Sequence, residues 1–463
     1  MNTKAQSFLK SLKGKKIALC GIGRSHLPLV SLFTKYGAAV TACDKRTEEQ
    51  LGDMAVEATN AGAVLRLGEN YLDNLDADIV FRTPGMRYYM EELTLLREKG
   101  VTVTSEMEVF FDLCPCKIIA VTGSDGKTTT TTVISEMLKA EGKNVHLGGN
   151  IGKPLLPEIE TISEDDYAVV ELSSFQLISM RQSPDVAVVT NLAPNHLDVH
   201  KDMQEYIDAK KNIVLHQNAF SKAVLNLDND ISNSFSKDVR GVLYKFSRRQ
   251  QVSNGAYMKE NGDIVFCENG NETFIMNRSD IKIPGLHNVE NYLAAISAVW
   301  GDVSVDSIVK TAKNFGGVAH RNEFVRELNG VKYYNDSIAS SPTRTALGTL
   351  SLYDEKIIVI LGGYDKHLDY TDLGKLIVKK VKTAIIMGAT GPKIEQAILS
   401  ADEYSKENPR IIKVNNMEEA VQAAFESAQS GDIVSMSPAS ASFDLYKNFE
   451  ERGEHFKSLV NKL

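Results

Sequence analysis

The sequence predicts an α/β protein of three domains whose sheets are mostly parallel. Short apolar runs of strand length alternate along the chain with longer segments of helical periodicity. In each third of the chain, one such run ends in a glycine-containing turn that opens a new strand-and-helix unit. We therefore expect a Rossmann-like domain at 1–105, a central doubly wound domain at 106–317 and a second Rossmann-like domain at 318–463.

Composition narrows the class of protein. The 463 residues suffice for several buried cores, and 43% hydrophobic and 24% charged residues are typical of globular proteins. A net charge of −8 argues against a nucleic-acid-binding face, and no apolar run is long enough to cross a bilayer. The five cysteines, including a Cys-Pro-Cys at 114–116, are odd in number and lack metal-ligand spacing. We therefore expect a cytoplasmic protein with neither nucleic acid nor membrane as a partner.

The first expected domain begins with a strand at 16–20, a Gly-Ile-Gly turn and a helix, which is how a dinucleotide-binding fold starts. The third glycine position of that fingerprint holds His26 instead. Asp44 ends the next strand, about 20 residues downstream, where an acid binds a ribose hydroxyl. A later strand leads into Thr83 and Gly85, which we expect at the second lip of the same crevice. A βα turn without a ligand is the alternative interpretation.

The central domain carries the strongest motif of the chain. An apolar run at 118–121 is followed by Thr-Gly-x-x-Gly-Lys-Thr and a threonine-rich helix start. Glycines let backbone N–H groups approach phosphate oxygens, and the helix N-terminus adds a positive dipole end. We expect Lys127 to reach the β- and γ-phosphates of a nucleotide and the Thr128 hydroxyl to hold Mg2+. Val121 replaces the first glycine of the common phosphate-loop (P-loop) pattern, which disfavours motor and signalling NTPases. A glycine turn with an accidental Lys-Thr is the alternative.

Polar side chains follow the neighbouring strands of the central domain. The apolar run at 167–171 ends in Glu171, at the position of a metal-binding acid beside a P-loop. A strand at 185–190 leads into a loop that holds His196. The last domain shows three more strand-and-turn units, at 356–361, 383–387 and 432–436.

Seven further motifs follow one another along the chain: Glu-Leu-Ser-Ser-Phe-Gln-Leu from 171, Asn-His-Leu-Asp from 195, His-Asn-x-x-Asn from 287, His-Arg-x-Glu from 320, Asn-Asp-Ser from 335, Leu-Gly-Gly from 361 with Lys366, and Ser-Pro-Ala-Ser-Ala-Ser-Phe-Asp from 437. Together with the P-loop, this set resembles the Mur ligase family over nearly the whole chain. Mur ligases are ATP-dependent amide-forming enzymes of peptidoglycan precursor synthesis. The stretch from 437, with Lys-Asn-Phe at 447–449, favours the branch that adds D-glutamate to UDP-N-acetylmuramoyl-L-alanine.

The resemblance implies a mechanism that uses ATP and two Mg2+ ions. ATP phosphorylates the terminal carboxylate of the acceptor, and the D-glutamate amine attacks the resulting acyl phosphate. Thr128 and Glu171 are implied to hold the first Mg2+ ion, and His196 to help hold the second. The family often has an aspartate before this histidine, and Asn195 stands there in this chain. A satisfied core or loop histidine is the alternative interpretation of His196.

A lysine carbamate, formed with CO2, is also implied. Lys210 matches the lysine that the family carbamylates. The resemblance implies that the catalytic residues are Lys210, Lys127 and His196. Burial depresses the pKa of a lysine, and a neutral amine can add CO2. An exposed helix lysine is the alternative, and the adjacent Lys211 leaves the register open.

The resemblance further implies three groups of binding residues. The ATP site comprises Gly123, Ser124, Asp125, Gly126, Lys127, Thr128, Thr129, Asn291, Arg321 and Asp336. The UDP-substrate site comprises Gly23, Arg24, Ser25, Asp44, Arg46, Thr83, Gly85 and Asn150. The D-glutamate site comprises Ser340, Lys366, Ser442 and Phe449. A surface ion pair is the alternative for Arg321 and Asp336, and Ile338 stands where the family commonly has a lysine.

Several other functions stay open on the sequence alone. Another Mur ligase would add L-alanine or a diamino acid. Folylpolyglutamate synthase shares the last two domains but lacks a comparable opening segment of about 100 residues. An oxidoreductase would use the first crevice, and a non-catalytic UDP-sugar sensor would not need Glu171, His196 and Lys210 together. The favoured interpretation is a cytoplasmic, monomeric ligase of small-molecule substrates that serves cell-wall synthesis, cell shape and cell division.

Overall fold

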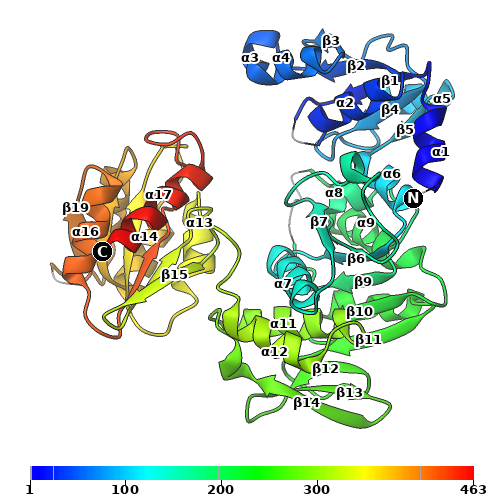
Figure 1. Ribbon diagram of the computed structural model, residues 1–463. Coiled ribbons are helices and arrows are strands. Elements are labelled where there is room, and N and C mark those ends of the chain that lie inside the picture. Colours follow the sequence, from blue (N-terminus) through cyan, green and yellow to red (C-terminus); the bar gives the residue numbers. More distant parts are fainter. Residues whose placement is uncertain (1–2, 24, 195–198, 407) are drawn as a thin grey trace. The chain divides into compact units, whose positions relative to one another are not determined.

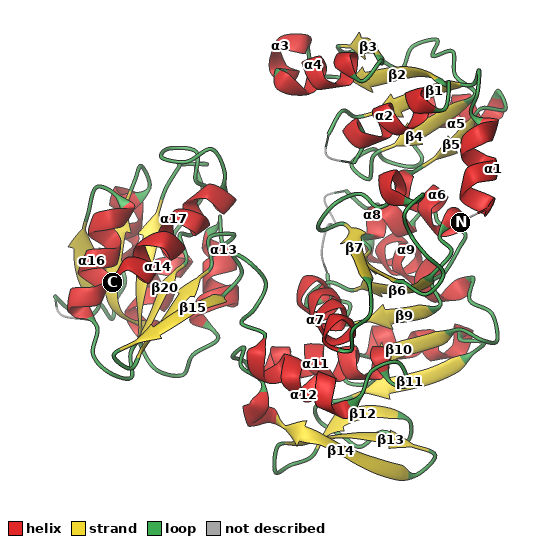
Figure 2. Cartoon of the chain, viewed as in Figure 1, coloured by secondary structure: helices red, strands yellow, loops and turns green. Residues whose placement is uncertain are grey.

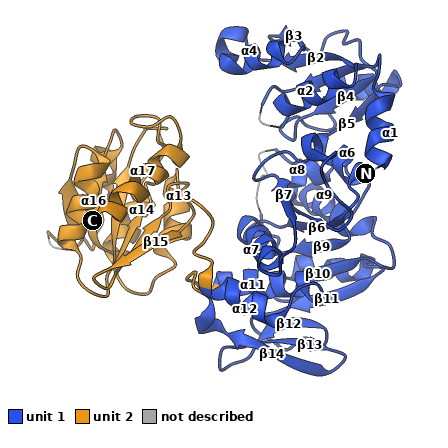
Figure 3. Ribbon diagram, in the orientation of Figure 1, with its two compact units in different colours: residues 1–281, 287–313 blue, residues 282–286, 314–463 orange. Residues whose placement is uncertain are grey.

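The computed structural model describes residues 3–23, 25–194, 199–406 and 408–463 (Figure 1). Its contacts divide the chain into two compact units (Figure 3). Unit 1 comprises 1–281 and 287–313, and unit 2 comprises 282–286 and 314–463. The predicted Arg24, Asn195 and His196 lie outside the described residues. Among the described helices, none is both long and apolar enough to cross a membrane.

Unit 1 begins with a sheet of five parallel strands in the order β3-β2-β1-β4-β5. Its strands are β1 (Lys16–Cys20), β2 (Ala39–Asp44), β3 (Val64–Leu67), β4 (Ile79–Arg82) and β5 (Thr102–Thr104), and its helices are α1 (Thr3–Ser11), α2 (Leu27–Lys35), α3 (Glu48–Leu51), α4 (Asp53–Asn60) and α5 (Glu91–Glu98). The central strand β1 is buried from its second residue onward, as a continuous apolar run in a covered parallel sheet should be. The predicted strand at 16–20 is confirmed.

The second sheet of unit 1 has six parallel strands in the order β11-β10-β9-β6-β8-β7 (Figure 2). Its strands are β6 (Lys117–Thr122), β7 (Val145–Gly149), β8 (Tyr167–Glu171), β9 (Val186–Val189), β10 (Lys222–Asn226) and β11 (Val242–Phe246). Its helices are α6 (Glu106–Leu113), α7 (Lys127–Ala140), α8 (Ser174–Leu177), α9 (Met203–Leu215), α10 (Asp230–Ser234), α11 (Leu286–Val299) and α12 (Val305–Asn314). Because β6 lies between β8 and β9, the loops after these three strands meet at one edge, where a doubly wound sheet binds ligands.

A three-stranded antiparallel sheet, β12-β13-β14, was not expected from the sequence. It is formed by β12 (Gly255–Met258), β13 (Asp263–Glu268) and β14 (Asn271–Asn277). Asn269 and Gly270 join the last two strands and both have positive φ, at 53° and 81°. Asn-Gly in a two-residue connection is a strong hairpin signal, so the sequence did carry the information.

Unit 2 contains one six-stranded sheet in the order β15-β16-β20-β17-β18-β19. Only the β15–β16 pair is antiparallel. The strands are β15 (Glu323–Leu328), β16 (Val331–Asn335), β17 (Ile357–Gly362), β18 (Val381–Met387), β19 (Arg410–Lys413) and β20 (Ile433–Met436). The helices are α13 (Pro342–Thr345), α14 (Thr371–Lys380), α15 (Gly391–Leu399), α16 (Met417–Ser427) and α17 (Phe449–Lys462). Hydrophobic clusters cover both faces of this sheet, which is the doubly covered arrangement predicted.

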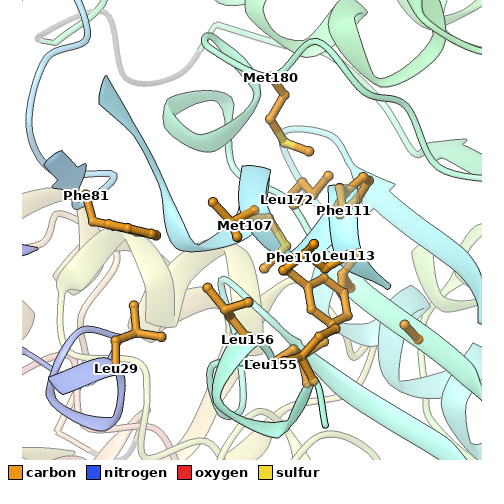
Figure 4. Packing of buried hydrophobic residues seen from close by; sticks show 14 of the residues in the cluster. Leu29, Phe81, Met107, Phe110, Phe111, Leu113, Leu155, Leu156, Leu172 and Met180 are labelled. Carbon is orange, nitrogen blue, oxygen red and sulfur yellow. The ribbon is translucent and has the colours of Figure 1, made fainter. Parts of the chain in front are cut away.

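One hydrophobic cluster joins the two large sheets of unit 1 (Figure 4). Leu29 and Phe81 reach it from the first sheet and its helices, and Phe110 reaches it from α6. Leu156 and Met180 complete the packing from the second sheet's side. The division of the chain at 105, 317 and 318 stays a prediction, because the contacts group the first two expected domains into one unit.

Glu106 is buried at this junction, at the start of α6. Its Oε1 accepts the backbone N–H groups of Leu155 and Leu156, at 3.0 and 2.8 Å. Burial raises the pKa of Glu106 to about 7, and the two backbone hydrogen bonds oppose the shift only in part.

We expect Glu106→Gln to stabilise the protein at alkaline pH, because glutamine keeps an acceptor oxygen and removes a buried carboxylate. The folded pKa lies above the unfolded value of about 4.3, so the penalty of ionisation is absent at low pH, grows as pH rises through about 4 to 7, and is full above that range. The free energy of unfolding from urea denaturation should therefore rise by roughly 1–3 kcal/mol near pH 8. The gain should shrink towards pH 5, and a pH-independent gain would contradict this interpretation.

Candidate active site

The P-loop connects β6 to α7 in the middle of the second sheet. Gly123 and Gly126 have φ angles of 150° and 77°, which L side chains rarely adopt. A Cβ atom on Gly126 would lie against Asn291 Oδ1, and one on Gly123 would lie against Thr190 Oγ1. Asn291, which the sequence predicts at the ATP site, is therefore in direct contact with the loop. Both glycines are required by conformation and by space.

We expect Gly126→Ala to weaken ATP binding at least about tenfold, because the loop must move away from Asn291. The same substitution at Gly142 is a matched control, since Gly142 also has positive φ, at 82°, but faces open space at the end of α7. Both variants should lose about 1–2 kcal/mol of stability from the left-handed backbone. Only Gly126→Ala should change the Kd for ATP in a calorimetric titration. Equal ATP affinity in the two variants would show that the Asn291 contact does not shape the loop.

Lys127 and Ser124 are held within the loop. Lys127 Nζ donates to the carbonyl oxygens of Gly123 and Ser124, both at 2.9 Å, so its ammonium lies over the loop where phosphate oxygens would gather. Ser124 Oγ lies 2.9 Å from the Tyr206 hydroxyl and from the carbonyl oxygen of Ala193. These contacts fix the loop to α9 and to the segment after β9.

Glu171, Thr128 and Asn150 form a hydrogen-bonded group beside the loop. Thr128 Oγ1 donates to Glu171 Oε2 at 2.7 Å, and Asn150 Nδ2 donates to Glu171 Oε1 at 2.7 Å. Glu171 is buried at the carboxyl end of β8. The hydroxyl, the carboxylate and the amide are hard oxygen donors, which fits the first predicted Mg2+ ion. Among the described residues, no group of three or more His, Cys, Asp or Glu side chains forms a ready-made metal site.

Lys210 lies on the inner face of α9. It is 2% exposed, and its Nζ donates to Thr122 Oγ1 at 3.1 Å and lies 4.9 Å from the centre of the Tyr206 ring. Burial lowers the pKa of Lys210 well below its ordinary value; the charge of Lys127 adds to the shift and that of Glu171 opposes it. A buried lysine with a lowered pKa is the kind of amine that adds CO2, so the surroundings fit the predicted carbamate.

Lys211 lies in a different environment. Its Nζ forms an ion pair with Asp238 at 2.7 Å, and its side chain is 29% exposed. Of the two adjacent lysines, Lys210 is therefore the one that the helix directs into the protein beside the P-loop.

The first sheet brings Asp44, Arg46 and Thr83 to its carboxyl edge. Asp44 Oδ2 accepts the backbone N–H of Ile22 at 2.8 Å, and Arg46 binds both oxygens of Asp44, at 2.8 and 3.0 Å. Burial acts to raise the pKa of Asp44, but its hydrogen bonds to Arg46 and Ile22 outweigh burial and hold the pKa below its usual value. Gly21 lies so close to Thr83 that a Cβ atom would come within 2.8 Å of Thr83 Cγ2. Asp44 and Thr83 thus flank the turn after β1.

His26 explains the missing third glycine of the dinucleotide fingerprint. Its ring is 2% exposed at the start of α2, and its Nδ1 has no hydrogen-bond partner among the described residues. Burial lowers the pKa of His26 to about 4, so the ring is neutral at physiological pH. The third glycine position of the fingerprint therefore holds a neutral, buried side chain at the start of α2.

In unit 2, Asp336 is buried after β16. It accepts the Thr349 and Ser437 hydroxyls at 2.5 and 3.1 Å and the Asn322 backbone N–H at 3.2 Å. Burial raises the pKa of Asp336 to about 6, while these hydrogen bonds and then the charge of Arg321 act in the opposite direction. The Asp336 carboxylate is therefore buried in a hydrogen-bonded network of unit 2. The alternative interpretation described only a surface ion pair.

The predicted D-glutamate residues follow the carboxyl ends of β16, β17 and β20. Lys366 is exposed after β17, and Ser442 is buried after β20. The Tyr364 backbone N–H donates to the Ala441 carbonyl at 2.9 Å, which places these two loops side by side. Ser340 follows β16, and Phe449 begins α17, where its carbonyl oxygen accepts the Ser337 hydroxyl at 2.7 Å.

Arg452 supports these loops and was missed by sequence reasoning. Its guanidinium is 3% exposed and donates to Ser337 Oγ, to the Ser337 carbonyl and to the carbonyls of Ser440 and Ala441, at 2.8–3.1 Å. Its acceptors are mostly backbone atoms, which leave no mark in the sequence. Thr122, Tyr206 and Asn191 were missed as well; Asn191 Oδ1 accepts the Asp125 backbone N–H at 3.0 Å. Thr122 and Asn191 stand at the ends of apolar runs in the sequence, and this position could have identified them as site residues.

Comparison with known proteins agrees with this arrangement. The profile of the Mur ligase middle domain matches residues 121–299, and that of the Mur ligase glutamate ligase domain matches residues 320–440. The chain is 53% identical over 466 residues to the UDP-N-acetylmuramoylalanine--D-glutamate ligase of Acetivibrio thermocellus, and the match covers 100% of each chain. The chain belongs to the Mur ligase family. An enzyme of the same name from Clostridium acetobutylicum is 51% identical over 459 residues, with 98% of each chain covered.

Solved Mur ligases share the fold. MurF from Acinetobacter baumannii aligns with a TM-score of 0.60 at 17% identity, over 100% of this chain and 98% of that chain. MurC from Thermotoga maritima aligns with a TM-score of 0.57 at 17% identity, over 97% of this chain and 99% of that chain. The predicted α/β class is thereby confirmed for this Mur ligase, while the roles of its individual site residues stay predictions.

Proposed function

We propose that this Mur ligase forms the amide bond between UDP-N-acetylmuramoyl-L-alanine and D-glutamate, with cleavage of ATP to ADP and phosphate, in peptidoglycan precursor synthesis. The observation that carries the proposal is the full-length identity of about half to enzymes of that name. The hydrogen-bonded group around Glu171 and the P-loop supports it, because it supplies what phosphoryl transfer between two anions requires.

The first step is phosphoryl transfer to the acceptor. An oxygen of the terminal carboxylate forms a bond to the γ-phosphorus, the bond to the β–γ bridging oxygen breaks, and ADP leaves. Lys127 is proposed to neutralise charge that develops on the phosphate oxygens. Mg2+, held by Thr128 and Glu171 at the first site and with the help of His196 at the second, would supply further charge neutralisation.

The second step is amide formation. The D-glutamate amine attacks the acyl carbon, a tetrahedral intermediate forms, and phosphate leaves with the electron pair of the C–O bond while the amine loses a proton. Ser340, Lys366, Ser442 and Phe449 are proposed to hold D-glutamate. An exposed ammonium such as that of Lys366 is suited to a carboxylate, and the buried Ser442 is held in the loop beside it.

Lys210 is proposed to act as a carbamate. Its neutral amine adds CO2 and releases one proton, and the product is an anion with two oxygens that suits a hard cation. The Lys210 side chain lies close enough to Lys127 and Glu171 to sense both charges, so its carbamate would lie beside the predicted Mg2+ ligands.

Location and assembly complete the proposal. All five cysteines are free thiols, which fits a reducing cytoplasm. We infer a monomer of 51.0 kDa, which light scattering tests directly.

The test is phosphate release from ATP and Mg2+ in the presence of UDP-N-acetylmuramoyl-L-alanine and one amino acid at a time. D-glutamate, L-glutamate, L-alanine, L-lysine and meso-diaminopimelate form the panel. The proposal predicts release with D-glutamate alone. Release with another amino acid instead would assign the chain to a different step, and no acceptor-dependent release would favour a non-catalytic UDP-sugar sensor.

A further inference from the structure

Arg82 is a buried cation that joins the two large sheets of unit 1. It is the last residue of β4 and is 1% exposed. Its Nη2 donates to the Phe175 carbonyl at 3.0 Å and to Ser179 Oγ at 2.6 Å, and its Nη1 donates to the Met86 carbonyl at 3.3 Å. One planar guanidinium therefore holds one acceptor from the loop that follows β4 and two acceptors from the segment that follows β8.

The two segments that Arg82 joins both line a cavity of about 600 Å3. One wall is the loop 84–90, which contains Gly85 and Met86. The other wall includes Phe175 and His200. Met86 and Phe175 both line the cavity, and Arg82, which is not among the lining residues, donates to the carbonyl oxygens of both.

The wall that contains Phe175 is also connected to the P-loop group. It belongs to α8, which begins three residues after Glu171 and is fixed by a capping box between Ser173 and Gln176. Ser174 Oγ forms a hydrogen bond with His200 Nε2 at 2.8 Å, and the His200 ring stacks on Phe175 with centroids 5.0 Å apart. The link between this wall and Glu171 is therefore the short chain segment of two residues that separates Glu171 from α8.

We propose that Arg82 is a positioning residue that holds the 84–90 loop at a fixed distance from α8, and thereby aligns the bound UDP-substrate with Glu171 and the P-loop. This inference rests on the proposed function, because the predicted UDP-substrate residue Gly85 lies on that loop. The acceptor carboxylate must meet the γ-phosphate in line, and a misplacement of about 1 Å costs on the order of a hundredfold in rate.

The charge and burial of Arg82 make this link specific. Burial lowers the pKa of Arg82, and the negative charge of Glu108 opposes that shift. Lysine would keep the cation but present a single ammonium in place of the fork, so it cannot reproduce bonds to both walls in the same geometry. Arg82→Lys therefore weakens the hydrogen bonds between the two segments but keeps a positive charge at this buried position.

A matched set of variants separates positioning from general stability. Ser179→Ala removes one acceptor of Arg82, and with it the hydrogen bond that the same hydroxyl gives to the Glu108 carboxylate. Arg181→Lys is the control, because among the described residues Arg181 donates its hydrogen bonds within its own segment, to the carbonyls of Ile178 and Met180, at 3.4 and 2.9 Å. Thermal unfolding of each variant shows whether the fold is retained.

The first readout is amide hydrogen exchange of the full-length protein without substrates. In Arg82→Lys, the peptides that cover 84–90 and 174–179 should exchange together at least about tenfold faster. Arg181→Lys should leave the 84–90 peptide unchanged. Unchanged exchange of 84–90 in Arg82→Lys would overturn the inference, whatever the enzyme's substrates are.

The second readout is steady-state kinetics. Arg82→Lys should raise KM for UDP-N-acetylmuramoyl-L-alanine at least about tenfold and lower kcat, Ser179→Ala should raise that KM about threefold, and the Kd for ATP should stay within about twofold in both. Equal changes in every substrate constant would indicate a structural role only and would overturn the inference. If exchange responds as expected but the wild type does not use D-glutamate, the proposed function fails and the link made by Arg82 stands.

Discussion

Lys210→Ala is expected to retain less than about 1% of the wild-type kcat, because one group that stabilises transition-state charge contributes on the order of 10²–10³ in rate. The variant loses the buried amine that would carry the carbamate beside Lys127 and Glu171. Phosphate release with saturating substrates measures the effect. Formate or acetate added to Lys210→Ala should restore part of the activity, since a short carboxylate can occupy the place of the missing carbamate.

Lys211→Ala is the matched control for this substitution. Lys211 is the next residue on α9, and its Nζ pairs with Asp238 and lies 6.0 Å from the centre of the Phe235 ring, both outside the P-loop group. Its turnover should stay within about twofold of the wild type, because a surface ion pair contributes at most about 1 kcal/mol to stability. Near-normal turnover of Lys210→Ala, or equal losses in the two variants, would refute the carbamate role.

Glu171→Gln is expected to lower kcat about a hundredfold and to raise the Mg2+ concentration needed for half-maximal activity. Glutamine has one acceptor oxygen where Glu171 uses two, one for Thr128 and one for Asn150. The substitution therefore removes a negative charge and leaves one of these two donors facing an amide N–H2. A Mg2+ titration of phosphate release separates the two effects.

Glu141→Gln serves as the control for Glu171→Gln. Glu141 lies at the other end of α7, where it accepts the backbone N–H and the hydroxyl of Ser304. Its Mg2+ dependence should match that of the wild type. An unaltered Mg2+ requirement in Glu171→Gln would remove this carboxylate from the metal site.

The sequence predicts the buried parallel strands well because they are continuous apolar runs. β1 and β8 have the predicted bounds, each an apolar run with one charged residue at its end, Lys16 and Glu171. Lys210 was separable from Lys211 in principle, since Tyr206, Lys210 and Ile213 recur at helical spacing and all three are buried. A lysine on the apolar face of a predicted helix indicated that the side chain of Lys210 would be buried.

Arg82 shows where sequence reasoning ends. It follows an apolar run and precedes Thr83, yet its acceptors include two backbone carbonyls, and two of its three acceptors lie more than 90 residues away. Every residue has a backbone carbonyl, so a sequence motif cannot identify an arginine whose acceptors are backbone atoms. Arg452 could not be identified from the sequence for the same reason, because three of the four hydrogen bonds of its guanidinium end on backbone carbonyls and the fourth on the distant Ser337 hydroxyl.

Oxygen transfer from the acceptor to phosphate is the measurement to make first on the complete enzyme. UDP-N-acetylmuramoyl-L-alanine labelled with 18O in its carboxylate is incubated with ATP, Mg2+ and D-glutamate. The masses of the released phosphate and of the UDP product are then measured by mass spectrometry. An acyl-phosphate ligase that uses D-glutamate gives phosphate with one 18O atom and a UDP product heavier by one glutamyl unit. Unlabelled phosphate beside that product, or no product with D-glutamate, would contradict the proposed reaction.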